Sequence, residues 1–109
     1  MKIYLAGPYN GDNVISVLSN IRQGIQAAAD LMRKGHIVYC PFLDFLIGLM
    51  PGEAIPQEIY QVNSLAWINC CDLLLLLPGW ETSNGTKREI KEAESHGIPV
   101  TAYNFEDWS

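Results

Sequence analysis

The chain has 109 residues, which is enough for one small domain with a single hydrophobic core. We therefore expect one domain over residues 1–109. Hydrophobic residues make up 49% of the chain and charged residues 17%, a composition that excludes a disordered protein. The formal net charge is −5, and the 7 Lys and Arg residues form no cluster. Binding to a nucleic-acid polymer, which needs clustered cations against phosphates, is therefore not expected.

The apolar runs are far shorter than the roughly 20 residues that a membrane-spanning helix requires. The first residues lead straight into a predicted strand, so we expect neither a signal peptide nor a membrane helix. The cysteines, Cys40, Cys70 and Cys71, lack the CxxC spacing of redox and metal motifs. Reduced thiols in a cytoplasmic protein are the expectation that follows.

The first predicted elements are a strand and a long helix. Residues 2–6 (KIYLA) form a short apolar strand that ends at a Gly-Pro pair. Asp12 and Asn13 can cap the following helix, and Gly35 ends it after two cations. Apolar residues recur in this helix at the spacing of one helical face: Val14, Leu18, Ile21, Ile25, Ala28 and Met32.

Strands and helices continue to alternate through the rest of the chain. A second strand is expected over 36–40 (HIVYC), followed by an irregular segment, 41–56, with room for one helical turn at 43–49. The remaining elements are a helix over 57–70, a strand over 72–77, a helix over 84–96 and a strand over 98–102.

This alternation, with leucine-rich strands, predicts an α/β fold. The expected architecture is a doubly wound, flavodoxin/Rossmann-like parallel sheet with helices on both faces and strand order 2-1-3-4, with room for a fifth strand. Ligands in such sheets bind at the carboxyl ends of the strands where the strand order reverses. Here those ends are followed by Gly7-Pro8 and Pro78-Gly79. The sequence therefore predicts a cleft between the first and third strands.

Polar residues open the helix at 84–96. Ser83, Asn84, Gly85 and Thr86 bring hydroxyl groups and free backbone N–H groups to the positive end of the helix dipole, a usual setting for a phosphate. Glu89 lies beside the sheet-facing stripe of this helix, close to the predicted cleft. Ordinary helix capping explains the same residues, so both interpretations stay open.

Three motifs carry a resemblance to a known family: YLAG in the first strand, CDLLLLLPGWE through the third strand, and S-x-G-x-x-x-E at the next helix. Together they resemble the nucleoside 2-deoxyribosyltransferase-like superfamily, and in particular small bacterial and phage-encoded members with an LPGWE-S-x-G signature. The resemblance covers residues 2 to about 101. It implies a doubly wound α/β fold and cleavage or exchange of the N-glycosidic bond of (deoxy)nucleosides or their 5′-monophosphates, without a metal or organic cofactor.

The resemblance also implies roles for individual residues. Glu89 falls on the catalytic glutamate, which attacks C1′ of the sugar, and Tyr4 falls on a tyrosine that positions it; an ordinary core aromatic is the alternative for Tyr4. Gly7, followed by Pro8, falls on the glycine that lets the first loop approach the ligand. Ser83 stands where nucleoside transferases carry an aspartate, and resembles members that act on 5′-monophosphates. A nucleotide is therefore favoured over a bare nucleoside.

One position departs from the family. Ser64 occupies the place of an aspartate that helps to deliver a proton to the leaving base, and serine cannot be that acid. Asp44, Glu53 or Glu58, in or near the irregular segment, could substitute for it. Without a substitute the chain would be a catalytically weak module that binds a nucleotide as a sensor, and this alternative stays open.

Other candidate residues are less specific. Trp80 lies at the predicted cleft mouth, where it could stack on a base, although packing inside the protein is the simpler interpretation. Lys87 and Arg88 follow the helix cap and could add charge toward a phosphate, although a solvated face is the simpler interpretation of both. His36 and His96 have no Cys, Asp or Glu partners at metal-ligand spacing, so no metal site is predicted.

A homo-oligomer, at least a dimer, is expected for three reasons. A sheet of four strands leaves only a shallow cleft, whereas ligand sites usually bury most of their ligand. The members that this chain resembles assemble through symmetric interfaces, and a neighbouring chain completes each active site. The segment 41–52 is unusually apolar, and large exposed apolar patches usually mark contact surfaces. The aromatic tail, 103–109, could reach across such an interface, with Asn104 as the polar group that it supplies. Alternatively, 41–52 folds back over its own core as a lid.

Overall fold

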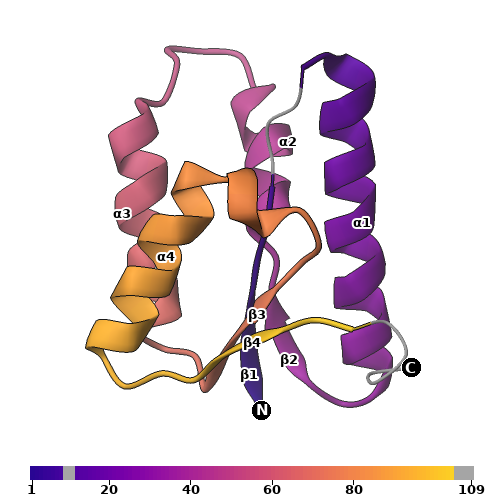
Figure 1. Ribbon diagram of the computed structural model, residues 1–109. Helices are drawn as coiled ribbons and strands as arrows, with labels where there is room; N and C mark the ends of the chain where they lie inside the picture. Colours follow the sequence, from indigo (N-terminus) through magenta and orange to yellow (C-terminus); the bar gives the residue numbers. More distant parts are fainter. Residues whose placement is uncertain (9–11, 105–109) are drawn as a thin grey trace.

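The computed structural model describes residues 1–8 and 12–104. Parallel strands form a single 4-stranded sheet in the order β2-β1-β3-β4, which confirms the predicted fold class and strand order (Figure 1). No fifth strand occurs in the described residues. The strands are β1 (Lys2–Ala6), β2 (Ile37–Tyr39), β3 (Leu73–Leu76) and β4 (Val100–Ala102).

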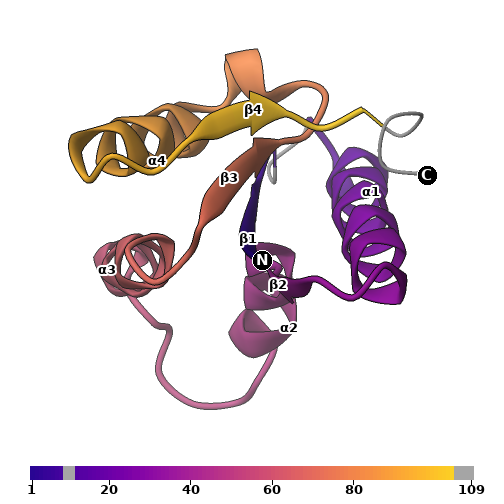
Figure 2. The ribbon, with the colours of Figure 1, turned by 90° about the horizontal axis from the view of Figure 1, so that it is seen from below.

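Helices cover both faces of the sheet, as the sequence predicts. The long helix α1 packs on one face, whereas α3 and α4 pack on the other (Figure 2). Two short 3-10 turns, η1 and η2, precede α2 and α4. The helical segments are α1 (Val14–Arg33), η1 (Pro41–Leu43), α2 (Asp44–Gly48), α3 (Gln57–Ile68), η2 (Trp80–Thr82) and α4 (Asn84–Ser95). None of the helices in the described ranges is long and apolar enough to cross a membrane.

The central strands β1 and β3 are buried on both faces. Because side chains alternate along a strand, each of these strands supplies two separate hydrophobic clusters. The cluster under α1 contains Ile3, Leu5, Leu73 and Leu75. The cluster under α3 and α4 contains Tyr4, Ala6, Leu74 and Leu76. This double burial accounts for the unbroken leucine run, since an alternating polar residue would face a helix on either side.

The apolar face predicted for α1 is wrong in part. Ala28 is buried and Ile21 packs partly against the core, but the other four side chains are largely exposed, including Val14 at 71% and Met32 at 61%. The buried side of the helix consists of Gly24, Ala27, Ala28 and Leu31. Small residues allow the helix axis to approach the sheet, and the ring of Phe42 from η1 fills the space beside Gly24.

The segment between β2 and α3 contains the predicted helical turn, which is α2. Phe42 is 2% exposed and belongs to the cluster under α1. Four of the apolar side chains that follow it are exposed: Leu46, Ile47, Leu49 and Met50. Of these side chains, then, only that of Phe42 is folded over the chain's own core.

We predict that Gly24→Ala destabilises the fold by about 1–3 kcal/mol. At an exposed helical site the same change stabilises by about 1 kcal/mol. At Gly24, however, an added Cβ would lie 2.4 Å from Cδ2 and 2.6 Å from Cε2 of Phe42, so the ring would have to move. Urea denaturation measures the difference. Ser19→Ala, at an exposed position of α1, is the control and should leave stability unchanged or slightly raised. A more stable Gly24→Ala protein would contradict this close packing.

Candidate functional site

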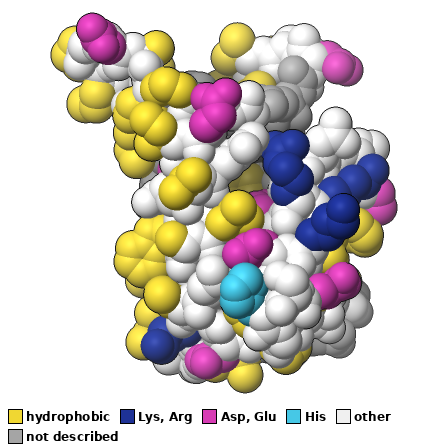
Figure 3. Space-filling view, turned by 90° about the vertical axis from the view of Figure 1, so that its left-hand side faces the viewer, with side chains coloured by type: hydrophobic (Ala, Val, Ile, Leu, Met, Phe, Trp, Pro, Cys, Tyr) yellow, Lys and Arg dark blue, Asp and Glu magenta, His cyan; other side chains and the backbone are white. Residues whose placement is uncertain are grey.

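A cavity of about 970 Å³ opens at the carboxyl ends of β1 and β3. Its walls come from the turn after β1, the first turn of α4, and the segment that contains α2 and α3. Figure 3 shows this side of the molecule, where a hollow separates the protruding segment before α3 from the face that carries the Lys and Arg side chains of α4. The cavity lies where the strand order reverses, as the sequence predicts, and its size suits a small organic ligand.

Most of the predicted site residues line this cavity: Gly7, Pro8, Asp44, Ser64, Ser83, Asn84, Gly85, Thr86 and Glu89. Trp80 does not line it; the side chain packs against the core cluster under α3 and α4, so the packing interpretation is the correct one. Asn104 follows β4 and lies outside the cavity of its own chain. Its role toward a neighbouring chain stays a prediction.

Gly7 has a structural reason of its own. A Cβ at this position would lie 2.8 Å from Cβ of Leu77, a distance that side chains essentially never adopt. Pro8 in turn sits against Gly79, which has a φ of +90° that favours glycine. The two turns at the carboxyl ends of β1 and β3 therefore pass each other at close range, and the turn after β1 lines the cavity with Gly7 and Pro8.

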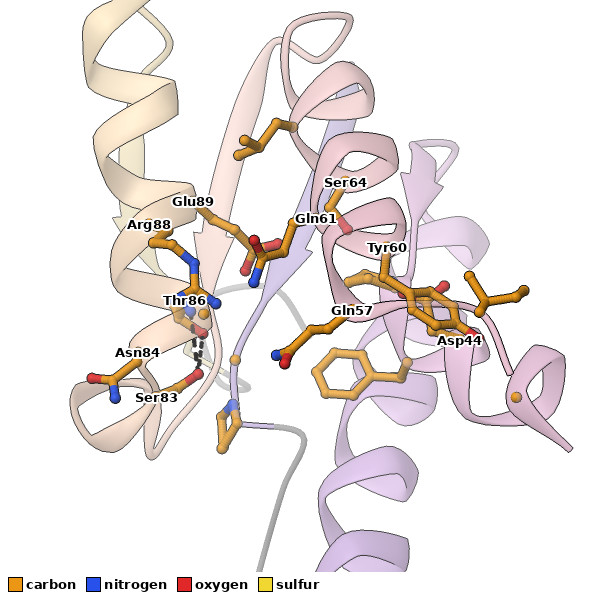
Figure 4. A pocket seen from close by; sticks show the side chains of 18 of the residues that line it. Asp44, Gln57, Tyr60, Gln61, Ser64, Ser83, Asn84, Thr86, Arg88 and Glu89 are labelled. Atoms are coloured by element: carbon orange, nitrogen blue, oxygen red, sulfur yellow. Dashed lines mark hydrogen bonds between the residues drawn. The ribbon is translucent and has the colours of Figure 1, made fainter. Parts of the chain in front are cut away.

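Ser83 caps α4. Its Oγ accepts a hydrogen bond from the backbone N–H of Thr86 at 3.2 Å and another from Oγ1 of Thr86 at 3.0 Å (Figure 4). With both of these accepted, the hydroxyl proton of Ser83 remains available for a ligand. The backbone N–H groups of Asn84 and Gly85 belong to the first helical turn, where no intrahelical acceptor exists. Capping and ligand binding are thus compatible at this helix end.

Glu89 reaches the cavity from the second turn of α4, and its Oε2 accepts a hydrogen bond from the hydroxyl of Tyr4 on β1. Tyr4 is completely buried, and its ring stacks on Tyr39 with 5.4 Å between centroids. The ring of Tyr39 stacks in turn on Trp67 of α3 at 5.0 Å. Tyr4 is therefore both a core aromatic and the partner of Glu89, and the stack holds its hydroxyl in place.

The electrostatics of Glu89 are unusual for a carboxyl group. Burial raises its pKa from 4.5 to about 7, while the hydrogen bond from Tyr4 and the charge of Arg88 oppose the rise and Asp44 adds to it. Burial, with the nearby charge of Glu89, also raises the pKa of Tyr4 well above its ordinary value. Glu89 therefore changes its charge near neutral pH, which is characteristic of functional carboxyl groups.

Several cavity residues were not identified from the sequence. Gln57, Tyr60 and Gln61 line it from α3, and Figure 4 shows Gln61 beside Glu89. Gln57, Gln61 and Ser64 have the i, i+4, i+7 spacing of one helical face, a signal that could have identified this polar stripe. Arg88 lines the cavity with an exposed side chain, so a solvated position and a charge toward the cavity are compatible at this residue.

The three carboxyl groups considered as substitutes for the acid missing at Ser64 differ in their position relative to the cavity. Asp44 lines the cavity, whereas Glu53 and Glu58 do not. Ser64 itself is 8% exposed and lines the cavity from α3. Within residues 1–8 and 12–104, no three or more His, Cys, Asp and Glu side chains gather as metal ligands would.

A doubly wound parallel sheet with a cavity at the carboxyl ends of its strands is the architecture of small-ligand-binding α/β domains. The chain belongs to the family described as "Domain of unknown function (DUF4406)", whose model matches residues 1–102. No curated protein matches it.

Two solved structures are similar. A 2-deoxyribosyltransferase from the psychrotolerant bacterium Bacillus psychrosaccharolyticus is 24% identical, with a TM-score of 0.70 over 94% of this chain and 71% of that chain. A conserved protein from Enterococcus faecalis V583 is 22% identical, with a TM-score of 0.69 over 93% of this chain and 61% of that chain. The predicted likeness to the 2-deoxyribosyltransferase fold is thus confirmed, and the narrower LPGWE-S-x-G grouping stays a prediction.

We predict that the chain loses stability as the pH rises and that Glu89→Gln removes this loss. The native pKa of Glu89 is raised, so its stabilising contribution is complete below about 4.5 and is lost as the pH rises through about 7. At about pH 8, Glu89→Gln should be more stable than the natural chain by about 1–3 kcal/mol, and at about pH 5 the two should be similar. Urea titrations at each pH measure the free energy of unfolding of the two proteins. Glu94→Gln, at an exposed position of α4, is the control; equal pH slopes in all three proteins would contradict the assignment.

Proposed function

We propose that this chain cleaves or exchanges the N-glycosidic bond of (deoxy)nucleoside 5′-monophosphates, with Glu89 as the nucleophile. The observation that carries the proposal is the Tyr4–Glu89 hydrogen bond at a cavity whose edge is the first turn of a helix. A carboxylate beside an anion-binding helix end suits a substrate with a phosphate a few bonds away from its reacting carbon. The likeness in fold to a 2-deoxyribosyltransferase supports the same class of chemistry.

The proposed reaction follows from the hydrogen-bonded pair of Tyr4 and Glu89. Tyr4 holds Oε2 of Glu89, which leaves Oε1 to bond to C1′ of the sugar. The electron pair of the C1′–N bond leaves with the base, which takes up a proton from water, and a glycosyl ester remains on Glu89. Water, or a second base, then attacks C1′, loses a proton to the solvent and releases the carboxylate. With a pKa of about 7, a large fraction of Glu89 is ionised at neutral pH, and the carboxylate stabilises the positive charge that develops on the sugar.

The 5′-phosphate is assigned to the first turn of α4. Ser83 can donate its hydroxyl proton, Asn84 and Gly85 can donate their backbone N–H groups, and Arg88 adds a guanidinium group on the same side of the cavity. Charge-assisted hydrogen bonds of this kind are the strongest that a phosphate forms in proteins. A bare nucleoside would leave these donors without an acceptor.

A second candidate function is nucleotide binding with little or no turnover, as in a sensor module. The observation that favours it is Ser64, a buried hydroxyl where the resembling enzymes carry an acid. General acid catalysis is typically worth about 10²–10⁴-fold in rate, so its loss would leave a slow enzyme or a binding protein.

The expected homo-oligomer stays a prediction. Exposed apolar side chains on α3 and on the segment before it support it: Leu46, Ile47, Leu49, Met50, Ile59 and Val62. Figure 3 shows hydrophobic side chains gathered on this side of the molecule. Such a surface on a small domain is usually covered by another protein surface.

We predict that Glu89→Ala reduces base release at least about 10³-fold while the fold stays intact, because the bond-forming oxygen is removed. The measurement is chromatography of free base after incubation with a panel of ribo- and deoxyribonucleoside monophosphates. Glu94→Ala is the control and should keep full activity. Turnover in Glu89→Ala within a few-fold of the natural chain would end the nucleophile assignment. Tight binding of a monophosphate without any base release by the natural chain would establish the sensor function instead.

We predict that Ser83→Asp weakens binding of a nucleoside 5′-monophosphate at least about tenfold more than binding of the matching nucleoside, because the new carboxylate repels the phosphate. Calorimetry measures both affinities. Ser83→Asn keeps a neutral capping residue and is the matched control, in which both affinities should change little. Equal losses for the two ligands in Ser83→Asp would mean that Ser83 is only a helix cap.

A further inference from the structure

The cavity has a second polar end that the proposed chemistry does not use. Asp44, the first residue of α2, and Tyr60 of α3 line the side opposite Ser83 and Arg88, as Figure 4 shows. Asp44 is half-buried, and it is the one carboxyl group besides Glu89 among the cavity-lining residues that the structure describes.

Charge fixes the direction in which a nucleotide would lie. The first turn of α4 and Arg88 attract a phosphate, whereas the carboxylate of Asp44 repels one. Glu89 lies between these two ends, facing the middle of the cavity (Figure 4). With the phosphate at α4 and C1′ at Glu89, the base is directed toward α2 and α3.

Asp44 meets the base as a carboxylate. Burial raises the pKa of Asp44, but the side chain is only half-buried, so water and the hydrogen-bond donors of a base can still reach and stabilise its carboxylate form. The titratable groups that the structure describes around it are Tyr39 and Cys40 at the end of β2, Tyr60 of α3, and Glu89 across the cavity. None of these is a cation, and Arg88 lies on the opposite side of the cavity. An ionised carboxylate accepts hydrogen bonds and donates none.

The common bases differ in what they offer to such an acceptor. Guanine alone presents two adjacent donors, N1–H and the 2-amino group, which match the two oxygens of a carboxylate. Hypoxanthine keeps N1–H but lacks the amino group. Adenine places the lone pair of N1 where guanine has a proton, and this lone pair would face the charge of Asp44. Gln57 and Gln61 each carry a donor and an acceptor, so they adapt to any base.

The same end of the cavity offers a surface for the flat face of a base. Tyr60 lines the cavity beside Asp44, and its ring is partly exposed (Figure 4). Base–aromatic stacking is favourable for every base, so Tyr60 would add affinity without choosing among them. Selection among bases therefore falls to Asp44.

We propose that Asp44 reads the base of the bound nucleotide and that its carboxylate selects guanine. The inference rests on the proposed function, because the orientation of the ligand follows from a phosphate at α4 and a sugar at Glu89. It names the substrate as a guanine nucleoside 5′-monophosphate.

The test compares deoxyguanosine, deoxyinosine and deoxyadenosine 5′-monophosphates. Affinities are measured by calorimetry in the Glu89→Gln background, where the bond stays intact, and initial rates of base release are measured in the natural chain. We expect the guanine nucleotide to bind about 10- to 100-fold more tightly than the hypoxanthine nucleotide. This ratio corresponds to one hydrogen bond to a charged group, which hypoxanthine cannot form. The adenine nucleotide should bind still more weakly. A guanine-to-hypoxanthine ratio within about threefold of unity would overturn the proposal.

Asp44→Asn tests the residue directly. One carboxylate oxygen becomes an amide NH₂, which meets a donor of guanine, so the guanine preference should fall to within about threefold of unity. Glu58→Gln on α3 removes the same charge outside the cavity and should keep the preference. A preference that survives Asp44→Asn would overturn the proposal. So would an equal drop in turnover for all three nucleotides with unchanged binding, because Asp44 would then be a proton donor.

The results separate the two proposals. A guanine preference in binding that depends on Asp44, without base release by the natural chain, would support the inference and refute the glycosidase function. Base release without any preference among the three nucleotides would support the function and refute the inference.

Discussion

The burial of β1 and β3 on both faces is the constraint on which the rest of this structure depends. Each strand contributes side chains to the hydrophobic cluster under α1 and to the one under α3 and α4. The two strands therefore cannot shift or turn without exposing apolar surface on both sides of the sheet. Their carboxyl ends are consequently held side by side, and the turns that follow pass at the distance that Gly7 and Leu77 allow. The cavity is a result of this arrangement, since two parallel strands that end together leave a gap between the helices that follow them.

The same burial determines the properties of Glu89. Tyr4 occupies a core position on β1, and stacking on Tyr39 keeps its hydroxyl aimed at the carboxyl group of α4. Removal from water raises the pKa of Glu89, and the hydrogen bond from Tyr4 prevents a larger rise. A carboxyl group with this balance is partly ionised at neutral pH and still shielded from water, and both properties suit the proposed nucleophile. The structural core and the proposed chemistry thus share one side chain.

The cavity is also polarised along its length. A helix N-terminus and Arg88 lie at one end, Asp44 lies at the other, and Glu89 faces the space between them. A ligand with an anionic group and a hydrogen-bond-donating ring would lie in one direction only, because the reverse would bring like charges together. Such an orientation effect needs no large binding surface, which suits a domain whose sheet has only 4 strands.

The amino-acid sequence by itself determined the elements, their order and the end of the sheet where the cavity lies, because strand–helix alternation and handedness leave few other arrangements. It also identified Ser83 and Glu89, since capping residues and spacing within one helix are local properties. Only the tertiary structure decided which side of α1 is buried. Apolar residues occur around much of that helix, and the side with Gly24 faces the core because the ring of Phe42 packs directly against that glycine. The tertiary structure alone showed that Asp44, rather than Glu53 or Glu58, shares a cavity with Arg88, since the packing of distant helices leaves no local signal that would choose among the three.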